Sequence, residues 1–126
     1  MPEIVALAFG TYWLDPEGIL HGVASAGIEH TAEQALEQLA LQRTMGGGRP
    51  RPFFMDIRGV RALTREARAF YAGPEAAEVF SATALLISSP LSRALGNFFL
   101  GLNKPHMPTR LFTSEAEAVA WLRKFL

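Results

Sequence analysis

Short apolar runs and amphipathic stretches alternate along most of this chain, and the two patterns predict strands and helices in turn. The apolar runs predict short strands over residues 4–9, 12–14, 19–23, 53–57, 82–87 and 109–112. Between the second and third runs, Asp15-Pro16-Glu17-Gly18 supplies the proline and glycine of a tight turn. We therefore expect the first strands to form a hairpin or meander.

The first amphipathic stretch begins with Thr31-Ala32-Glu33-Gln34, which fits a helix capping box. In such a box the threonine and glutamine side chains satisfy backbone N–H groups that the helix leaves free. The spacing of Leu36 and Leu39 places both on the buried side of the helix that follows. Three glycines at 46–48 are expected to end this helix before the strand at 53–57.

Three further helices are predicted by similar signals. Thr64 opens the second helix and Gly73 follows its end. Ser89-Pro90 starts the third, because proline suits the first helical position, and Ser114 caps the last. Helices and strands thus alternate in the later part of the chain, which is typical of an α/β fold. We expect one domain over residues 1–126, with a mixed sheet of four or five strands and about four helices.

The formal net charge of the chain is zero, because 12 basic residues balance 12 acidic ones among 126. A neutral chain attracts neither phosphate backbones nor anionic membranes, so we expect no nucleic-acid partner. No apolar run approaches the roughly 18 residues that a membrane span needs. The composition therefore predicts a cytoplasmic protein without a membrane span.

Candidates for catalysis and for metal binding are sparse. The chain has no cysteine, which excludes a thiol nucleophile and a thiolate metal site. His21, His30 and His106 are scattered without metal-ligand spacing. We expect no metal, no cofactor and no enzymatic activity.

The segment Asp56-Ile57-Arg58-Gly59-Val60 and the helix start at Thr64 resemble the STAS domain, the fold of bacterial anti-sigma-factor antagonists. The segments 90–93 and 97–99, with Pro105, Phe112 and Trp121-Leu122, are similar to the SpoIIAA-like group of small bacterial proteins, much of it functionally uncharacterised. The resemblance covers residues 17–126 by the order of elements. It implies a non-enzymatic signalling module that acts by docking a protein partner.

The helix start at Thr64 departs from the antagonist pattern. Antagonists carry a phosphorylatable serine one residue beyond an aspartate. In this chain the aspartate position is Thr64 and the serine position is Arg65. Because arginine does not accept that phosphate, we expect the usual phosphorylation switch to be absent. The ordinary role of Thr64 is to cap its helix, which contributes about 1 kcal/mol.

Polar residues near the predicted strand ends are candidates for binding a ligand or a partner. Ser88, Ser89 and Arg93 surround a helix start whose free N–H groups suit an anion, or else they form an ordinary capped helix with a surface arginine. Asp56 is either a base or ligand, or accepts hydrogen bonds from the turn that follows it. Arg58, Thr64 and Arg65 complete this set, and Thr64 and Thr113 are expected at the same edge of the sheet.

The helix predicted after Pro90 is unusually apolar. Its apolar residues include Leu95, Phe98, Phe99, Leu100 and Leu102. Either they form the surface for a protein partner or a homodimer, or they line a pocket for an apolar ligand. The resemblance also supports a pocket for an apolar ligand, because CRAL–TRIO lipid-transfer domains are related in fold to STAS domains. A carrier or sensor of an apolar or anionic molecule, such as a lipid, is therefore the alternative function.

Overall fold

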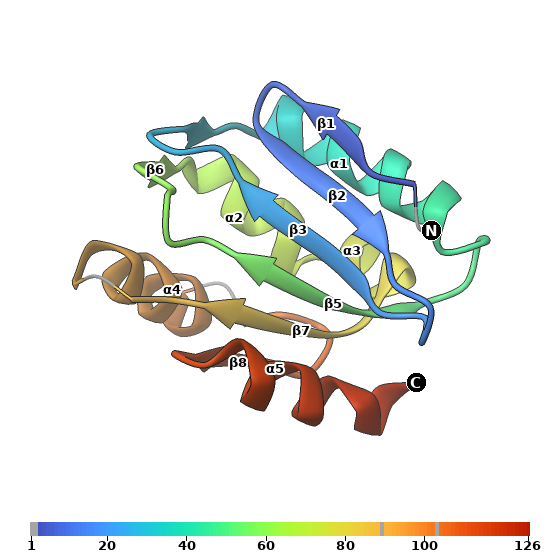
Figure 1. Ribbon diagram of the computed structural model, residues 1–126. Helices are drawn as coiled ribbons and strands as arrows, with labels where there is room; N and C mark the ends of the chain where they lie inside the picture. The colour runs from blue at the N-terminus through green and yellow to red at the C-terminus, as the bar shows by residue number, and fades with distance from the viewer. Residues whose placement is uncertain (1–2, 89, 103) are drawn as a thin grey trace.

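The computed structural model describes residues 3–88, 90–102 and 104–126, with side chains for all of these except 98–102. Its main feature is a six-stranded mixed sheet in the order β1-β2-β3-β5-β7-β8 (Figure 1). The strands are β1 (Val5–Leu7), β2 (Gly10–Leu14), β3 (Leu20–Ala24), β5 (Arg51–Asp56), β7 (Phe80–Leu86) and β8 (Thr109–Phe112). The remaining strands, β4 (Glu29–His30) and β6 (Ala62–Leu63), pair in parallel as a separate two-stranded sheet.

The amino-terminal strands form the predicted meander, since β1 pairs antiparallel with β2 and β2 with β3. In the turn between β2 and β3, the Asp15 carboxylate accepts hydrogen bonds from the backbone N–H groups of Glu17, Gly18 and Ile19. Gly18 there has a φ of 101°, a conformation that favours glycine. Strands β5, β7 and β8 extend the sheet in parallel with β3, so four carboxyl ends share one edge.

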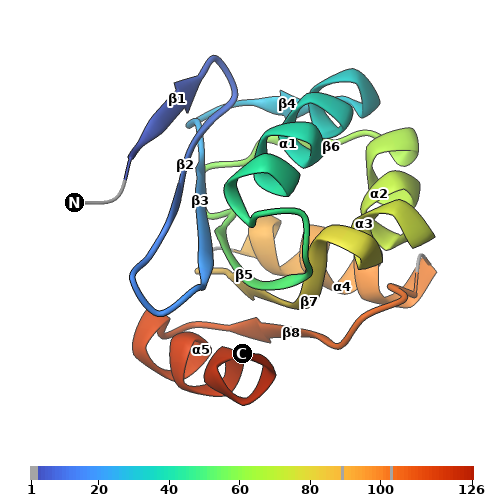
Figure 2. The same cartoon turned by 90° about the vertical axis from the view of Figure 1, so that its right-hand side faces the viewer.

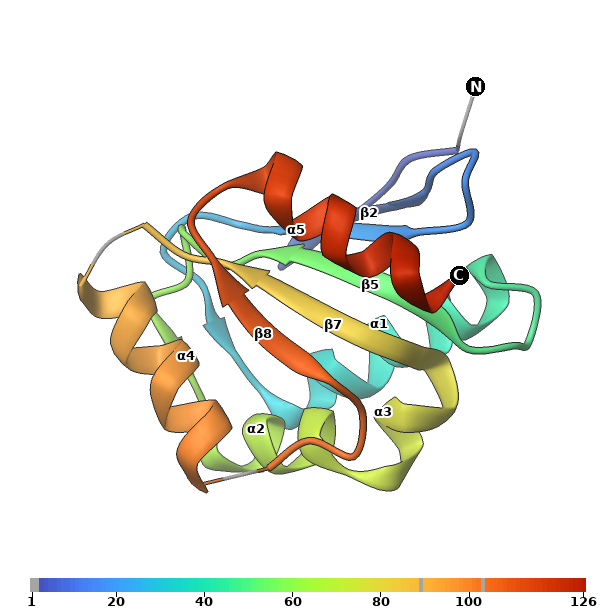
Figure 3. The same cartoon turned by 90° about the horizontal axis from the view of Figure 1, so that it is seen from below.

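Helices cover both faces of the sheet. One face carries α1 (Ala32–Met45), α2 (Arg65–Ala72), α3 (Pro74–Val79) and α4 (Pro90–Leu102), whereas α5 (Glu115–Leu122) and the 3-10 turn η1 (Arg123–Phe125) lie on the other (Figures 2 and 3). No helix within the described ranges is long and apolar enough to cross a membrane.

Three of the predicted helix starts are capped as expected. The Thr31 side chain accepts from the Gln34 backbone N–H, and the Gln34 side chain accepts from the Thr31 N–H, which completes the capping box. Ser114 caps α5 by accepting from the Glu117 N–H. Gly46 ends α1 as predicted. Thr64 caps α2 in the same way.

The central strands are mostly apolar because the sheet is covered on both faces, although β7 also carries Ser81 and Thr83. On β5, Phe53 packs into the core beneath α1 to α4, whereas its neighbour Phe54 packs into the core beneath α5. Phe53 stacks on Phe80 of β7, with ring centroids 4.4 Å apart. Leu122, which is fully buried, anchors α5 over the second core.

The predicted α/β architecture with a mixed sheet is confirmed, but the expected counts are too low. In the described part of the chain the main sheet has six strands and there are five α-helices. The unpredicted α3 has only six residues and follows α2 directly, sharing Gly73 with its end. Strands β4 and β6 are two residues long, too short to leave a pattern in the sequence.

The predicted burial of Leu36 is wrong. Its exposed fraction is 57%, whereas Leu39 is 4% exposed. The buried side of α1 instead includes Gln38 and Gln42, which are 1% and 0% exposed. Gln38 takes a core position because its side chain is hydrogen-bonded to Tyr12, Tyr71 and Gln42, whereas the buried Nε2 of Gln42 has no partner among the described residues.

Truncating each leucine of α1 to alanine tests this assignment. We expect Leu39→Ala to lower the free energy of unfolding by about 2 to 5 kcal/mol, as for other buried leucines. Leu36→Ala, the matched control on the same helix, is expected to change it by less than about 0.5 kcal/mol. Urea denaturation measures both, and equal losses would contradict the orientation of α1.

Candidate functional site

Asp56 and Arg58 form a local ion pair at the carboxyl end of β5. The Asp56 carboxylate accepts from the Arg58 backbone N–H at 3.0 Å, and from the Arg58 guanidinium Nε and Nη2 at 2.9 and 2.7 Å. This bidentate bond uses both carboxylate oxygens and raises the pKa of Arg58. The interpretation of Asp56 as an acceptor for the following turn is thereby confirmed.

Thr64 caps α2 as predicted. Its hydroxyl oxygen accepts from the Ala67 backbone N–H at 3.2 Å, and its own N–H donates to the His30 carbonyl at 3.0 Å. Arg65, the first residue of α2, is exposed.

The described residues around the start of α4 include two of the polar candidates, Ser88 and Arg93. Ser88 is exposed and its backbone N–H donates to the Ser92 hydroxyl at 3.1 Å, while Arg93 is also exposed. Ser89 lies outside the described residues. Within the described ranges, no hydrogen bond or ion pair joins the Asp56–Arg58 pair, Thr64 and Arg93. Asp56 and Ser88 still follow neighbouring strands at one edge of the sheet, because Asp56 is the register partner of Leu86, two residues before Ser88.

Of the apolar candidates on α4, Leu95 is partly buried and packs against the core beneath α1 to α4. The side chains of Phe98, Phe99, Leu100 and Leu102 lie outside the described residues. Gly96 lets α4 approach β8 closely, since a Cβ at this position would lie 2.7 Å from the Leu111 Cδ2 atom.

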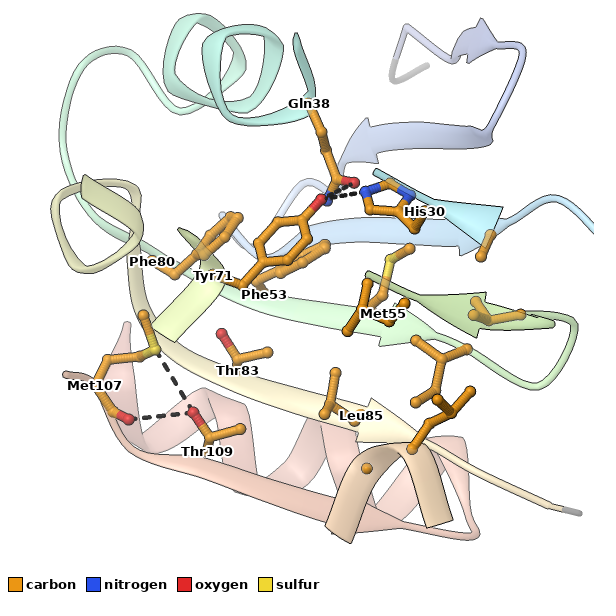
Figure 4. A pocket seen from close by; sticks show the side chains of 16 residues that line it. His30, Gln38, Phe53, Met55, Tyr71, Phe80, Thr83, Leu85, Met107 and Thr109 are labelled. Atoms are coloured by element: carbon orange, nitrogen blue, oxygen red, sulfur yellow. Dashed lines mark hydrogen bonds between the residues drawn. The ribbon is translucent and has the colours of Figure 1, made fainter. Parts of the chain in front are cut away.

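A cavity of about 80 Å³ lies between the sheet and the helices of this face, and Leu95 and Gly96 form part of its wall (Figure 4). Apolar side chains from several strands and from α4 make most of the lining: Ala24, Phe53, Met55, Ile57, Val60, Leu63, Phe80, Leu85, Leu95 and Met107. The remaining side chains that line it are polar but uncharged. We call this cavity the central pocket.

A chain of buried polar side chains forms one wall of the central pocket. The Gln38 side-chain oxygen accepts from the Tyr12 and Tyr71 hydroxyls at 2.9 and 2.7 Å. The Gln38 amide nitrogen donates to the Gln42 side-chain oxygen at 3.0 Å. On the other side, the Tyr71 hydroxyl is hydrogen-bonded to His30 Nε2 (Figure 4). We call these five residues the polar chain.

The polar chain is uncharged at neutral pH. Tyr71 has one hydroxyl hydrogen and gives it to Gln38, so His30 Nε2 carries a hydrogen and donates it to the Tyr71 oxygen. Burial lowers the pKa of His30 to about 4, and burial raises the pKa of Tyr71 well above its ordinary value. The wall therefore presents a neutral imidazole and a protonated phenol to the pocket.

A family model described as "Domain of unknown function (DUF7793)" matches residues 12–126. The chain belongs to this family. A similar solved structure is the crystal structure of an uncharacterized protein from the DUF3478 family with a SpoIIAA-like fold from Shewanella loihica PV-4. It is 17% identical with a TM-score of 0.57, and the match covers 97% of this chain and 92% of that chain. No relative is found among the curated proteins.

The comparison confirms the predicted SpoIIAA-like fold. At 17% identity the similarity concerns the fold and not the function. The DUF7793 chain thus has the architecture that its strand-end motif at 56–60 suggested. Among the described residues, no three histidine, aspartate or glutamate side chains gather as a group that could hold a metal ion.

Sequence reasoning missed His30, Gln38 and Tyr71 as site residues. They lie on β4, α1 and α2. His30 and Tyr71, which are hydrogen-bonded to each other, are 41 positions apart in the sequence. A signal was nevertheless present: Gln38 and Gln42 fall four positions apart, in line with the buried Ala35 and Leu39. Polar residues that share the buried stripe of a helix indicate partners within the core.

The depressed pKa of His30 predicts a loss of stability in acid. Between pH 6.5 and about 4 the unfolded chain binds a proton at this position and the folded protein does not, so stability falls as pH drops. The full loss is roughly 3 kcal/mol, at about 1.4 kcal/mol per pKa unit. Urea denaturation from pH 7 to pH 4 measures it.

The control for this measurement is a pair of histidine variants. In His30→Gln the free energy of unfolding should decrease less between pH 6.5 and 4 than in the wild type. The substitution should also lower this free energy at pH 7, because it disturbs the polar chain. His106→Gln, at an exposed position, should keep the wild-type pH dependence. The difference between wild type and His30→Gln isolates His30 from the other titrating groups, and identical slopes would contradict the prediction.

Proposed function

We propose that this DUF7793 domain is a non-enzymatic module that binds a small, uncharged, apolar molecule in the central pocket. The observation that carries the proposal is the lining of this pocket, in which none of the described side chains is charged and ten are apolar. Pockets of this kind, mostly apolar with a few polar groups, are typical of small-molecule sites. Apolar cavities also stay dry and take up apolar guests.

The dimensions of the pocket limit the guest. The cavity measures about 80 Å³, roughly half of the 150 Å³ apolar cavity that accepts benzene in another protein. Met55 and Met107 line it, and flexible thioether side chains adapt to the shape of a guest. The proposed ligand is therefore about as large as benzene or smaller.

Two features of the lining support binding without catalysis. The imidazole of His30 and the phenol of Tyr71 are engaged with each other and with Gln38, and both stay uncharged at neutral pH. No carboxylate lines the described pocket that would activate a hydroxyl as a nucleophile. The absence of a cation from this lining also favours an uncharged ligand over the anionic one considered from the sequence.

Docking of a protein partner is the second candidate function, and the SpoIIAA-like fold favours it. Helix α4 offers a place for it, because Leu91 is 53% exposed while Leu95 on the same helix lines the central pocket. We propose that a partner, or a second copy of this chain, contacts α4. Such contact would couple the partner at Leu91 to the ligand beside Leu95, which lies one turn further along the same face of the helix.

Xenon under pressure tests the first proposal, since it fills apolar cavities without needing a polar contact. In a ¹H–¹⁵N correlation spectrum, we expect xenon to shift the amide signals of pocket residues such as Leu85 and Thr83. Leu95→Phe should abolish these shifts by filling the cavity. The matched control Leu91→Phe adds the same ring to α4 outside the pocket and should leave them intact. Absence of xenon-induced shifts in the wild-type protein would refute the proposal.

The absence of the usual STAS phosphorylation switch is also part of the proposal. Phosphopeptide mass spectrometry on stressed cells that produce the protein should recover residues 63–68 in unmodified form. Arg65 stands where antagonists carry serine, and the Thr64 oxygen accepts the Ala67 N–H. Stoichiometric phosphate on Thr64 would contradict the prediction, and it would alter the cap of α2.

A further inference from the structure

We propose that Thr83 is the polar recognition point of the central pocket, and that its hydroxyl hydrogen-bonds to a single carbonyl or hydroxyl oxygen of an otherwise apolar ligand. This inference rests on the proposed binding function and adds to it the chemical class of the ligand. Thr83 lies on β7, the strand between β5 and β8 in the sheet that floors the pocket.

The hydroxyl of Thr83 has no hydrogen-bonding partner among the described residues. The residue is 8% exposed and lines the pocket. Its backbone N–H donates to the Pro108 carbonyl at 2.9 Å, but its hydroxyl makes no hydrogen bond in the described part of the chain. In Figure 4 no dashed line reaches Thr83, which lies between Tyr71 and Thr109. Most polar side-chain atoms inside proteins have a hydrogen-bonding partner, so an unpartnered hydroxyl that lines a cavity is available to a guest.

The other hydroxyls of the described lining are already committed. Tyr71 donates to Gln38 within the polar chain. Thr109, the register partner of Thr83 on β8, donates to the Met107 carbonyl at 3.1 Å. Thr83 is therefore the one hydroxyl among these three that keeps its hydrogen available to a guest in the pocket.

The surroundings of Thr83 determine what kind of group it can receive. The described lining has no arginine or lysine, and the nearest imidazole, that of His30, is neutral at pH 7. A carboxylate or phosphate in this pocket would be a buried charge without a counter-charge, which is strongly unfavourable. A ketone, aldehyde or alcohol needs one hydrogen bond, and the apolar lining from β5, β7 and α4 would cover its hydrocarbon part.

Cyclobutanone and methylenecyclobutane form a matched pair of probes for this inference. They have nearly the same shape, and only the ketone has an oxygen that can accept a hydrogen bond. Their dissociation constants can be measured by NMR titration of wild-type protein, Thr83→Val and Thr83→Ser. Thr83→Val keeps the shape of the side chain and removes the hydroxyl, whereas Thr83→Ser keeps the hydroxyl.

We expect Thr83→Val to weaken cyclobutanone binding by about three- to tenfold, the effect of one lost hydrogen bond, and to change hydrocarbon binding by less than about twofold. Thr83→Ser should retain the preference for the ketone. Thr113→Val, the same substitution at an exposed position outside the pocket, should leave both affinities unchanged. Butanoate, an anion of similar size, should not bind.

The possible outcomes separate this inference from the proposed function. If both probes bind and Thr83→Val affects them equally or not at all, the role of Thr83 is refuted while the binding function stands. If neither probe nor xenon binds the wild-type protein, the binding function itself is refuted. Should Thr83→Val not fold, nuclear Overhauser contacts between cyclobutanone and the Thr83 methyl group in the wild-type protein decide the matter, and their absence refutes the role.

Discussion

The hydrogen bonds accepted by the side-chain oxygen of Gln38 hold this face of the protein together. Through Tyr12 they reach β2 of the sheet, and through Tyr71 they reach α2 and then His30 at the end of β4. Three elements, β2, α2 and β4, are thereby linked to α1 through hydrogen bonds. Tyr12, Gln38, Gln42 and His30 are buried and Tyr71 is partly buried, so a shift of one of these elements would break hydrogen bonds that water does not readily replace.

The polar chain also explains why the core on this face is not fully packed. Phenol, imidazole and amide groups must meet at hydrogen-bonding distances, so their positions follow polar geometry and not the closest packing of carbon atoms. On the opposite face, the hydrophobic cluster beneath α5 includes Ile19, Phe54 and Leu122, and the buried His21 beside Phe54 is bonded to Asp15 in the turn before β3. The central pocket accordingly lies beside the polar chain.

The fold was largely predictable because its signals are local. Capping residues at Thr31, Thr64 and Ser114, and the apolar run of β5, each specify a structure within a few positions. The site was not predictable in the same way. His30, Gln38 and Tyr71 come from three separate elements, and only tertiary packing brings them together. The polar motif at 56–60, which the sequence made prominent, proves to be a turn closed by the Asp56–Arg58 pair.

The two kinds of polar group in the pocket have different consequences for function. The members of the polar chain that line the pocket, His30, Gln38 and Tyr71, hydrogen-bond to one another, so they shape the cavity and keep it uncharged. Thr83 lies on a strand held on both sides by parallel neighbours, so its position is rigid and its hydroxyl is free of partners in the described structure. A rigid, unengaged donor in an uncharged cavity loses little entropy when a guest binds. Selectivity for a ligand with one polar atom then follows from the sheet itself and requires no movement of the helices.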